Sequence, residues 1–214
     1  RVNAISTQDV SSDPSAGAAY DNYLALVNAG VTGAESIGGV FYFTNAFDTT
    51  TSGVDIVGTY AKAWSNGQST SFTGSVNYNK TEFDSDVDAL FNEESQFDFL
   101  NGTPNWRGVF TVLHEIGPVT LLGRANYYGG YENAADTTLV DIQEWDGEIL
   151  FDFEASYQVD EMLTLSAGAR NAFDNYPDAG DAAIGESCCG RIYRSDSVVD
   201  WQGGYYYVKA SASF

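Results

Sequence analysis

The chain has 214 residues, a formal net charge of -21 and a hydrophobic content of 43% that includes 14 tyrosines, 13 phenylalanines and 4 tryptophans. With only nine lysines and arginines it lacks the basic surface that nucleic-acid binding requires, so we expect no nucleic-acid partner. No apolar run approaches the roughly 20 residues of a membrane-spanning helix, which excludes that class of protein. The many aromatic residues and 22 glycines favour β structure instead.

The first predicted elements are a strand remnant at residues 2–6 and a long connection at residues 7–38, in which residues 20–29 can form a short helix. Residues 40–64 are compatible with one long bent strand or with two strands joined by a turn at residues 48–53. We favour one long strand because of the resemblance given below.

Most later segments alternate between polar and apolar residues, which is the period of a strand with two different faces. In one of them, Phe151 and Phe153 alternate with Asp152 and Glu154. A face that carries two carboxylates cannot form a dry core, although the opposite face is apolar. The alternating segments are residues 71–79, 119–128, 148–158, 163–170 and 205–214, and residues 106–113 form a less regular strand.

A membrane barrel explains this combination, because its outer face meets lipid and its inner face borders a watery or filled interior. The residues expected to face lipid are Ile149, Phe151, Phe153, Leu163, Leu165, Val208, Ala210 and Phe214. The residues expected to face the lumen are Arg124, Asp152, Glu154 and Arg170.

The connections between strands alternate between two sizes, as they do in outer-membrane barrels with tight periplasmic turns and long exterior loops. The short connections are residues 65–68, 114–117 and 159–162. The long ones are residues 7–38, 84–103, 131–146 and 175–200. We therefore predict an all-β, antiparallel transmembrane barrel in a bacterial outer membrane, with the four long loops extracellular.

No catalytic site can be assembled from the sequence, so we expect the protein not to be an enzyme. His114-Glu115 resembles half of a zinc-protease motif, but the chain has no second histidine. Residues 185–190 superficially resemble a nucleophile elbow, but they contain one residue too many and lack a histidine partner.

Metal and redox chemistry have only weak candidates. Asp84, Asp86 and Asp88 have the spacing that begins an EF-hand loop, but the required glycine is absent because Ala89 follows Asp88. We expect a solvated acidic loop, with calcium binding as the alternative, and no other cofactor. Cys188 and Cys189 are too few for a metal site, and their redox state is left open.

Leu165-Ser-Ala-Gly-Ala-Arg-Asn-Ala-Phe-Asp-Asn-Tyr-Pro177 is similar to the hallmark near the C-terminus of TonB-dependent outer-membrane receptors, with Ala172 in place of the usual leucine. Other segments resemble the same family, in the order expected for it. Residues 43–60 resemble the long strand of the family with its Asn-Ala and Gly-Val-Asp elements. The other matching segments are residues 105–110, residues 124–131 and the terminal Phe214.

The resemblance implies that the chain is about the last eight strands of a 22-stranded barrel. The N-terminal plug and the earlier strands would then lie outside residues 1–214, on a separate chain or in a part lost by cleavage, and the lumen residues above would face the plug or the substrate path. The implied partners are the rest of the receptor, the TonB system acting through the missing part, outer-membrane lipid and a surface lipoprotein.

The function implied is energised uptake of a bulky, scarce nutrient, such as a ferric siderophore, a cobalamin-like compound or an oligosaccharide. The main alternative is a complete eight-stranded barrel with a structural or adhesive role, whose interior would be filled by side chains. A soluble β-sandwich is a third hypothesis, and it would require protein to cover the face of Phe151 and Phe153.

Overall fold

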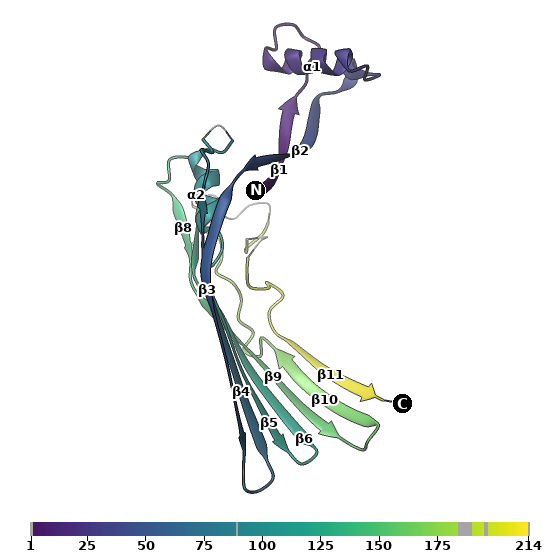
Figure 1. The fold of residues 1–214 in the computed structure, drawn as a ribbon, viewed down its shortest axis with the longest axis vertical. Helices are drawn as coiled ribbons and strands as arrows, with labels where there is room; N and C mark the ends of the chain where they lie inside the picture. The colour runs from purple at the N-terminus through teal and green to yellow at the C-terminus, as the bar shows by residue number, and fades with distance from the viewer. Residues whose placement is uncertain (1, 89, 184–189, 195–196, 214) are drawn as a thin grey trace. The chain divides into compact units, whose positions relative to one another are not determined.

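The computed structural model describes residues 2–88, 90–183, 190–194 and 197–213 (Figure 1). Within these ranges the chain forms eleven β-strands, two α-helices and one short 3-10 helix. The predictions for Cys188, Cys189 and Phe214, and most of the elbow-like segment 185–190, fall outside the described residues. No helix in the described part of the chain has the length and apolarity needed to cross a bilayer.

The chain divides into two compact units, Arg1–Thr50 with Phe83–Leu90 and Thr51–Glu82 with Phe91–Phe214. In the first unit an antiparallel pair of strands is joined by a segment with two helices. These elements are β1 (Val2–Asp9), α1 (Ala18–Asn28), the 3-10 helix η1 (Ala34–Ser36) and β2 (Gly39–Phe47).

The helix predicted at residues 20–29 is confirmed as α1, which begins two residues earlier and ends one residue earlier than expected. Asn22 of this helix donates through Nδ2 to Gln8 Oε1 and to the Asp9 carbonyl, both at 2.9 Å, so the helix is fixed to the end of β1. The buried apolar residues of this unit are Val10, Ala34, Phe47 and Val87.

The prediction of one continuous strand over residues 40–64 is wrong. β2 ends at Phe47, β3 (Thr49–Ala63) begins after one intervening residue, and the two strands belong to different sheets. Asp48 lies between them and bonds to the returning chain: its N–H donates to Ser85 Oγ at 3.2 Å, and its carbonyl accepts from the Asp84 N–H at 2.9 Å. Because these bonds replace a strand partner, the strand breaks at Asp48 without the turn at residues 48–53 that was the alternative.

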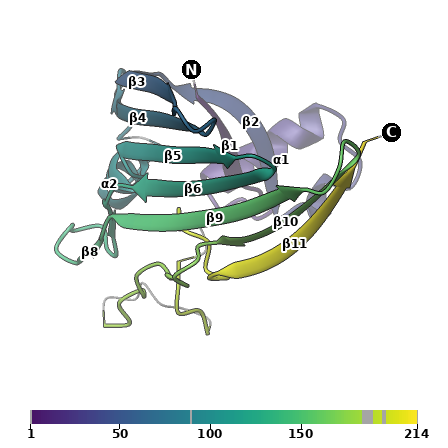
Figure 2. The same ribbon diagram turned by 90° about the horizontal axis from the view of Figure 1, so that it is seen from below.

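The second unit is built on one antiparallel seven-stranded sheet of order β11-β10-β9-β6-β5-β4-β3 (Figures 1 and 2). Its remaining strands are β4 (Ser69–Phe83), β5 (Trp106–Ile116), β6 (Val119–Tyr128), β9 (Glu148–Gln158), β10 (Leu163–Arg170) and β11 (Tyr205–Ala212). Each alternating segment predicted from the sequence lies in one of these strands, apart from the last residues of the chain. The antiparallel all-β fold class is therefore confirmed.

Tight turns join the strands at one end of this sheet, which we call the short-turn end, and the opposite end carries the long connections (Figure 1). Trp64 N–H bonds to the Gln68 carbonyl across the first turn, and Val159 N–H bonds to the Leu163 carbonyl across the last, both at 2.9 Å. The middle turn is shorter than predicted, since β5 continues to Ile116 and only Gly117-Pro118 remain between the strands. Gly117 adopts a φ of 54°, which a glycine tolerates without strain.

The seven-stranded sheet is open, because the described parts of β3 and β11 occupy its two edges and do not pair with each other. A complete eight-stranded barrel would pair the first and last strands, but β1 pairs only with β2 among the described residues. No second sheet is hydrogen-bonded to it within the described chain, and large apolar residues of one of its faces are exposed. The eight-stranded barrel and the sandwich are therefore not supported.

Candidate functional site

The strand registers bring the predicted lumen residues onto one face of the sheet. Arg124 of β6 lies opposite Asp152 of β9, and Glu154 of β9 lies opposite Gly168 of β10. Arg170 lies two residues beyond Gly168 and therefore on the same face. We call this the polar face. Its polar side chains continue across the sheet to Asp55 of β3, which accepts from Asn77 of β4 at 2.6 Å.

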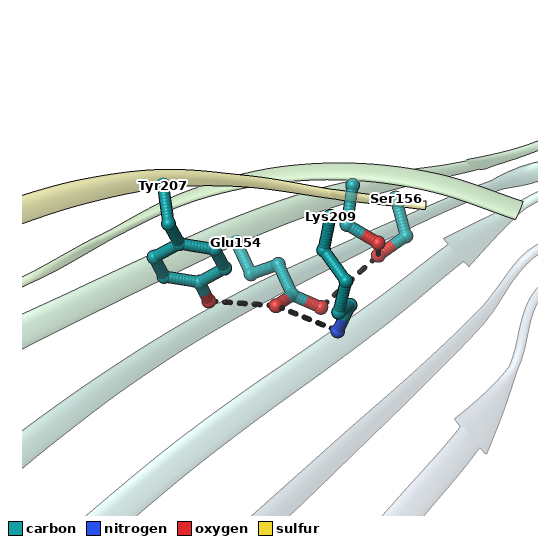
Figure 3. A network of polar contacts seen from close by, with 5 residues as sticks. Glu154, Ser156, Tyr207 and Lys209 are labelled. Atoms are coloured by element: carbon teal, nitrogen blue, oxygen red, sulfur yellow. Dashed lines mark hydrogen bonds and ion pairs between the residues drawn. The ribbon is translucent and has the colours of Figure 1, made fainter. Parts of the chain in front are cut away.

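Glu154 is the centre of a hydrogen-bond network on the polar face (Figure 3). Its Oε2 accepts from the Tyr207 hydroxyl at 2.6 Å and from Lys209 Nζ at 3.3 Å, both on β11. Its Oε1 accepts from the Ser156 hydroxyl at 3.1 Å, and Ser156 shares a hydrogen bond of 2.8 Å with Ser166 of β10. The network therefore connects β9, β10 and β11 through side chains as well as through the backbone.

Gly168 allows Tyr207 to reach Glu154 across the intervening strand β10. A Cβ at position 168 would lie 2.5 Å from the Tyr207 ring, so any side chain there would displace the ring. Neither Tyr207 nor Lys209 was among the predicted lumen residues. Their polar positions in the alternation of the last strand already indicated the correct face.

Asp152 lies opposite Arg124 in the strand register, but its hydrogen bonds are made with other residues. Its Oδ2 accepts from Asn126 Nδ2 at 2.9 Å, and its Oδ1 accepts from the backbone N–H of Asn171 at 3.0 Å. Arg124 instead donates through Nε to the Thr111 hydroxyl at 3.2 Å. Asp152 thus joins the sheet to the segment that follows β10.

That segment contains residues that sequence reasoning named only for their resemblance. Asn171 and Asn175 bond reciprocally, with Asn171 Nδ2 donating to the Asn175 carbonyl at 2.6 Å and Asn175 N–H donating to Asn171 Oδ1 at 3.0 Å. Asp174 Oδ1 accepts from the Gly204 N–H at 2.7 Å, just before β11 begins. We call Asn171, Asp174, Asn175 and Gly204 the clasp.

Backbone geometry explains the residue types in the clasp. Asn171 and Asp174 have φ values of 45° and 58°, a region that asparagine and aspartate enter more readily than other residues with side chains. Asn175 Nδ2 also donates to the Ile149 carbonyl at 3.2 Å. The clasp therefore holds together the long-loop ends of β9, β10 and β11. The Tyr176 hydroxyl hydrogen-bonds to the Asp174 carboxylate, and this bond raises the pKa of Tyr176.

Apart from Phe214, which lies outside the described residues, the residues expected to face lipid share the face opposite the polar face, which we call the apolar face. Phe153 is 45% exposed, Leu165 46% and Val208 86%. Rings form a chain across this face from Tyr60 to Phe72 and on to Phe110, with centroid separations of 6.2 and 6.4 Å. The others of the set, Ile149, Phe151, Leu163 and Ala210, occupy strand positions of the same parity. Their contact with lipid remains a prediction.

The buried apolar residues in the described part of the second unit lie outside the seven-stranded sheet, in the connections predicted as long loops. Residues 131–146 contain a hairpin of β7 (Tyr131–Ala134) and β8 (Ile142–Trp145), and residues 84–103 contain α2 (Glu93–Asn101). We call α2, β7, β8 and the adjoining residues 177–181 and 197–199 the loop cluster. The apolar residues buried in it are Tyr131, Ala134, Trp145 and Val199.

Aspartates and one glutamine hold the loop cluster together. Asp98 of α2 accepts from the Ala134 N–H, and Asp178 accepts from the Asp146 N–H, both at 2.8 Å. Gln143 Oε1 accepts from the Asp181 N–H at 2.8 Å. The long connections are therefore packed against a central hairpin by their own polar side chains.

A cavity of about 220 Å³ lies in the loop cluster beside the hairpin. Glu132 and Glu144, which are directly opposite in the β7–β8 register, line it together with Asn101, Asn105 and Asp146. A second cavity, of about 480 Å³, is lined by Arg191, Ile192, Tyr193 and Trp201. These cavities give the long-loop end concave surfaces of contrasting chemistry, one acidic and one aromatic.

The weak calcium candidates do not come together as a ligand set. Asp84 Oδ2 accepts from the Thr50 hydroxyl at 2.5 Å, and Asp86 Oδ1 accepts from the Asp88 N–H at 3.0 Å. Nowhere in the described part of the chain do three histidine, cysteine or acidic side chains gather in positions that could hold a metal ion. Calcium at this loop stays a prediction.

The sequence model described as "TonB dependent receptor-like, beta-barrel" matches residues 17–172. The chain belongs to this family. As a member of the TonB-dependent receptors, it is a section of an outer-membrane β-barrel. The family consists of transporters and receptors rather than enzymes.

Among solved structures, a chain described as "Copper transporter OprC" is similar in fold, with a TM-score of 0.53 and 20% sequence identity. The match covers 84% of this chain but 25% of that chain, so the receptor section described here spans about a quarter of its structural relative. Comparison with curated protein sequences finds no significant match.

Proposed function

We propose that this receptor section forms part of an active transporter that captures a bulky, scarce nutrient outside the outer membrane and imports it with energy supplied through TonB. The observation that carries this proposal is the two-faced sheet that ends in a packed loop cluster. The apolar face suits contact with lipid, and the polar face suits a lumen filled by a plug. The long-loop end would be extracellular and the short-turn end periplasmic.

The polar face supports a lumen through its hydrogen-bond chemistry. A cavity of about 390 Å³ near the short-turn end is lined by Ser69, Glu115, Thr120, Ser156 and Gln158. Partly exposed polar groups of this kind can change their hydrogen-bond partners at a small cost in free energy when a neighbouring surface moves. Water or a second protein surface can accept or donate the hydrogen bonds that are broken. A plug that moves against the barrel wall during transport needs such a surface.

The loop cluster supports capture of a ligand. A binding surface works better when it is already ordered before the ligand arrives, because less conformational entropy is lost on binding. The buried ring pair Tyr131–Trp145, with centroids 5.8 Å apart, gives the hairpin such order. The substrate classes proposed are a ferric siderophore, a cobalamin-like compound and an oligosaccharide. Because the similar solved structure is described as a copper transporter, copper is added to the substances to be tested.

The plug domain and earlier strands, the TonB system and a surface lipoprotein are the proposed partners. The plug and earlier strands would complete the barrel from the same or a separate chain. Co-purification from membranes in mild detergent, followed by mass spectrometry, identifies them directly.

The decisive experiment measures uptake by the full-length receptor in its native host. Cells with and without the receptor gene, and with TonB depleted, are supplied with labelled compounds of each class, including copper. If the receptor is a TonB-driven transporter, wild-type cells take up one of these compounds. Its uptake is then lost to the same extent when the receptor gene is deleted and when TonB is depleted. An Asp98→Ala variant, which loses the bond to β7, should reduce capture of that compound while membrane levels stay normal. Uptake that is unaffected by TonB depletion would contradict the proposal.

A further inference from the structure

The apolar face carries very little charge, so its two lysines are conspicuous. Lys62 lies near the short-turn end of β3 and Lys80 near the long-loop end of β4. Side chains alternate between the two faces along a strand, and the stacked rings of Tyr60 on β3 and Phe72 on β4 show that even-numbered residues of these strands lie on the apolar face. Lys62 and Lys80 therefore lie on this face. The remaining cations of the sheet, Arg107, Arg124, Arg170 and Lys209, belong to the polar face.

These two lysines differ in how their charge is balanced. Lys80 Nζ forms an ion pair of 2.7 Å with Glu82. Lys62 has no carboxylate within ion-pair distance among the described residues, although the chain has 30 acidic side chains and only nine lysines and arginines. A lysine at the border of a lipid-facing surface is stable only if its charged end reaches water or an anion.

The surroundings of Lys62 are ordered by a chain of contacts over three strands. Its Nζ lies 4.0 Å from the centre of the Trp64 ring, in a cation–π contact. Trp64 Nε1 donates to the Thr70 hydroxyl at 2.8 Å, and that hydroxyl is bonded to His114 Nδ1 at 2.8 Å. Thr70 is buried, with 7% of its surface exposed, whereas Trp64 is 42% exposed.

The result is a preorganised cation beside an indole that is fixed in orientation. The Trp64 ring can hold only one side of the Lys62 ammonium group, so other N–H donors remain directed away from the ring. Tryptophan prefers the membrane interface, at the depth where lipid phosphates lie. The group that fits this position is an anion that is itself anchored in the membrane.

We propose that Lys62, Trp64, Thr70 and His114 form a binding site for the headgroup phosphate of an anionic phospholipid at the short-turn end of the sheet. Lys62 supplies the charge and hydrogen bonds to a phosphate oxygen. Trp64 holds Lys62 in place and contacts the glycerol region, while Thr70 and His114 keep the indole in its orientation. The inference rests on the membrane placement of the sheet in the proposed function, but not on the identity of the transported nutrient.

The test uses the full-length receptor purified in a maltoside detergent, whose headgroup carries no phosphate. Thermal unfolding is followed before and after addition of phosphatidylglycerol, and separately after addition of inorganic phosphate. The wild-type protein should unfold at a higher temperature with phosphatidylglycerol, and added salt should weaken the shift because it screens the charge. Inorganic phosphate at the same concentration should give little or no shift, because it is not held at the interface.

The variants separate this site from general lipid effects. Lys62→Gln should lose most of the shift, Lys62→Arg should retain it, and the matched control Lys80→Gln at the other end of the apolar face should retain it. Trp64→Phe should reduce the shift, because the bond to Thr70 is lost while a ring remains. The proposal is overturned if Lys62→Gln responds to phosphatidylglycerol as the wild-type protein does, or if inorganic phosphate alone reproduces the shift. Membrane fractionation separates the two failures, since a receptor absent from the outer membrane contradicts the proposed function itself.

Discussion

Tyr207 shows how much of the polar face depends on single side chains. Its hydroxyl reaches Glu154 across β10 only because position 168 is a glycine. The alternation of the sequence predicted that Glu154 belongs to the polar face. It could not predict the partner, because the pairing joins residues 53 positions apart, and only the register of three strands brings them together.

Replacing Tyr207 with phenylalanine should lower the free energy of unfolding by about 1 kcal/mol, since a hydrogen bond to a partly screened carboxylate is lost while the ring remains. Urea titration of the receptor folded in lipid vesicles measures this change. Tyr205→Phe is the matched control, because the Tyr205 ring also contacts Tyr207 but its hydroxyl has no hydrogen bond among those described. Equal losses for the two variants would show that the bond to Glu154 contributes nothing.

The Tyr176 hydroxyl should make the clasp sensitive to alkaline pH. Its bond to the Asp174 carboxylate raises the pKa of Tyr176, so the protonated phenol is favoured in the folded protein. The stabilisation is fully present below the pKa of the unfolded tyrosine, about 10, and is lost as the pH rises through the higher folded pKa. Ultraviolet titration of tyrosinate in the wild-type protein and in Asp174→Asn measures this. The variant should titrate at lower pH, and an unchanged titration would exclude the bond.

At the scale of elements, β11 is the strand most dependent on contacts outside its own backbone. It pairs on one side with β10, and its start is held by the bond from Gly204 to Asp174. The alternation of residues 205–214 was sufficient to predict the strand. The clasp could be recognised from the sequence only as a resemblance to a family motif. Its bonds depend on the positive φ angles of Asn171 and Asp174, and the alternation of polar and apolar residues gives no information about such angles.

Asn171→Ala should release the long-loop end of β11. The variant loses two hydrogen bonds to Asn175 and places an alanine at a φ of 45°, where alanine is strained. Amide hydrogen exchange of Tyr205–Tyr207 should therefore become faster. Asn171→Gly relieves the backbone strain but does not restore the two hydrogen bonds. An exchange rate between those of the wild type and Asn171→Ala would therefore separate the effect of strain from the effect of the lost bonds.

Asn77→Ala is the control, because it also removes two hydrogen bonds of an asparagine side chain, one to Asp55 and one from Asn79, on the far side of the sheet. Exchange in β11 should not respond to it. If Asn171→Ala also left β11 unchanged, the clasp would have no role in holding the last strand.

The elements that sequence reasoning missed are those held by contacts distant in the chain. α2 did have a local signal, since Asn92 caps it by accepting from the Ser95 N–H at 2.8 Å and two glutamates follow in its first turn. The β7–β8 hairpin had none, because its strands have only four residues each. The break at Asp48 was equally hidden, since it depends on bonds to Asp84 and Ser85 from the returning chain.

At the scale of the whole molecule, the prediction that decides the architecture is that the apolar face meets lipid. Phe153→Arg should lower the free energy of unfolding in lipid vesicles by about 2–4 kcal/mol if this position lies near the middle of the bilayer. Urea titration in vesicles measures the loss. Ser75→Arg on the polar face is the control and should change stability little, since that side chain would meet water or polar groups. Equal effects of both arginines would contradict the assignment of the two faces.

The burial of Tyr131, Ala134, Trp145 and Val199 outside the sheet has a thermodynamic consequence. Release of water from apolar surface drives the loop cluster to fold, and that driving force weakens on cooling. Hydrocarbon tails around the strands give no such release once the sheet is inserted. With the sheet placed in lipid as proposed, chilling or chaotropic salt should therefore loosen the loop cluster while the strands keep their register.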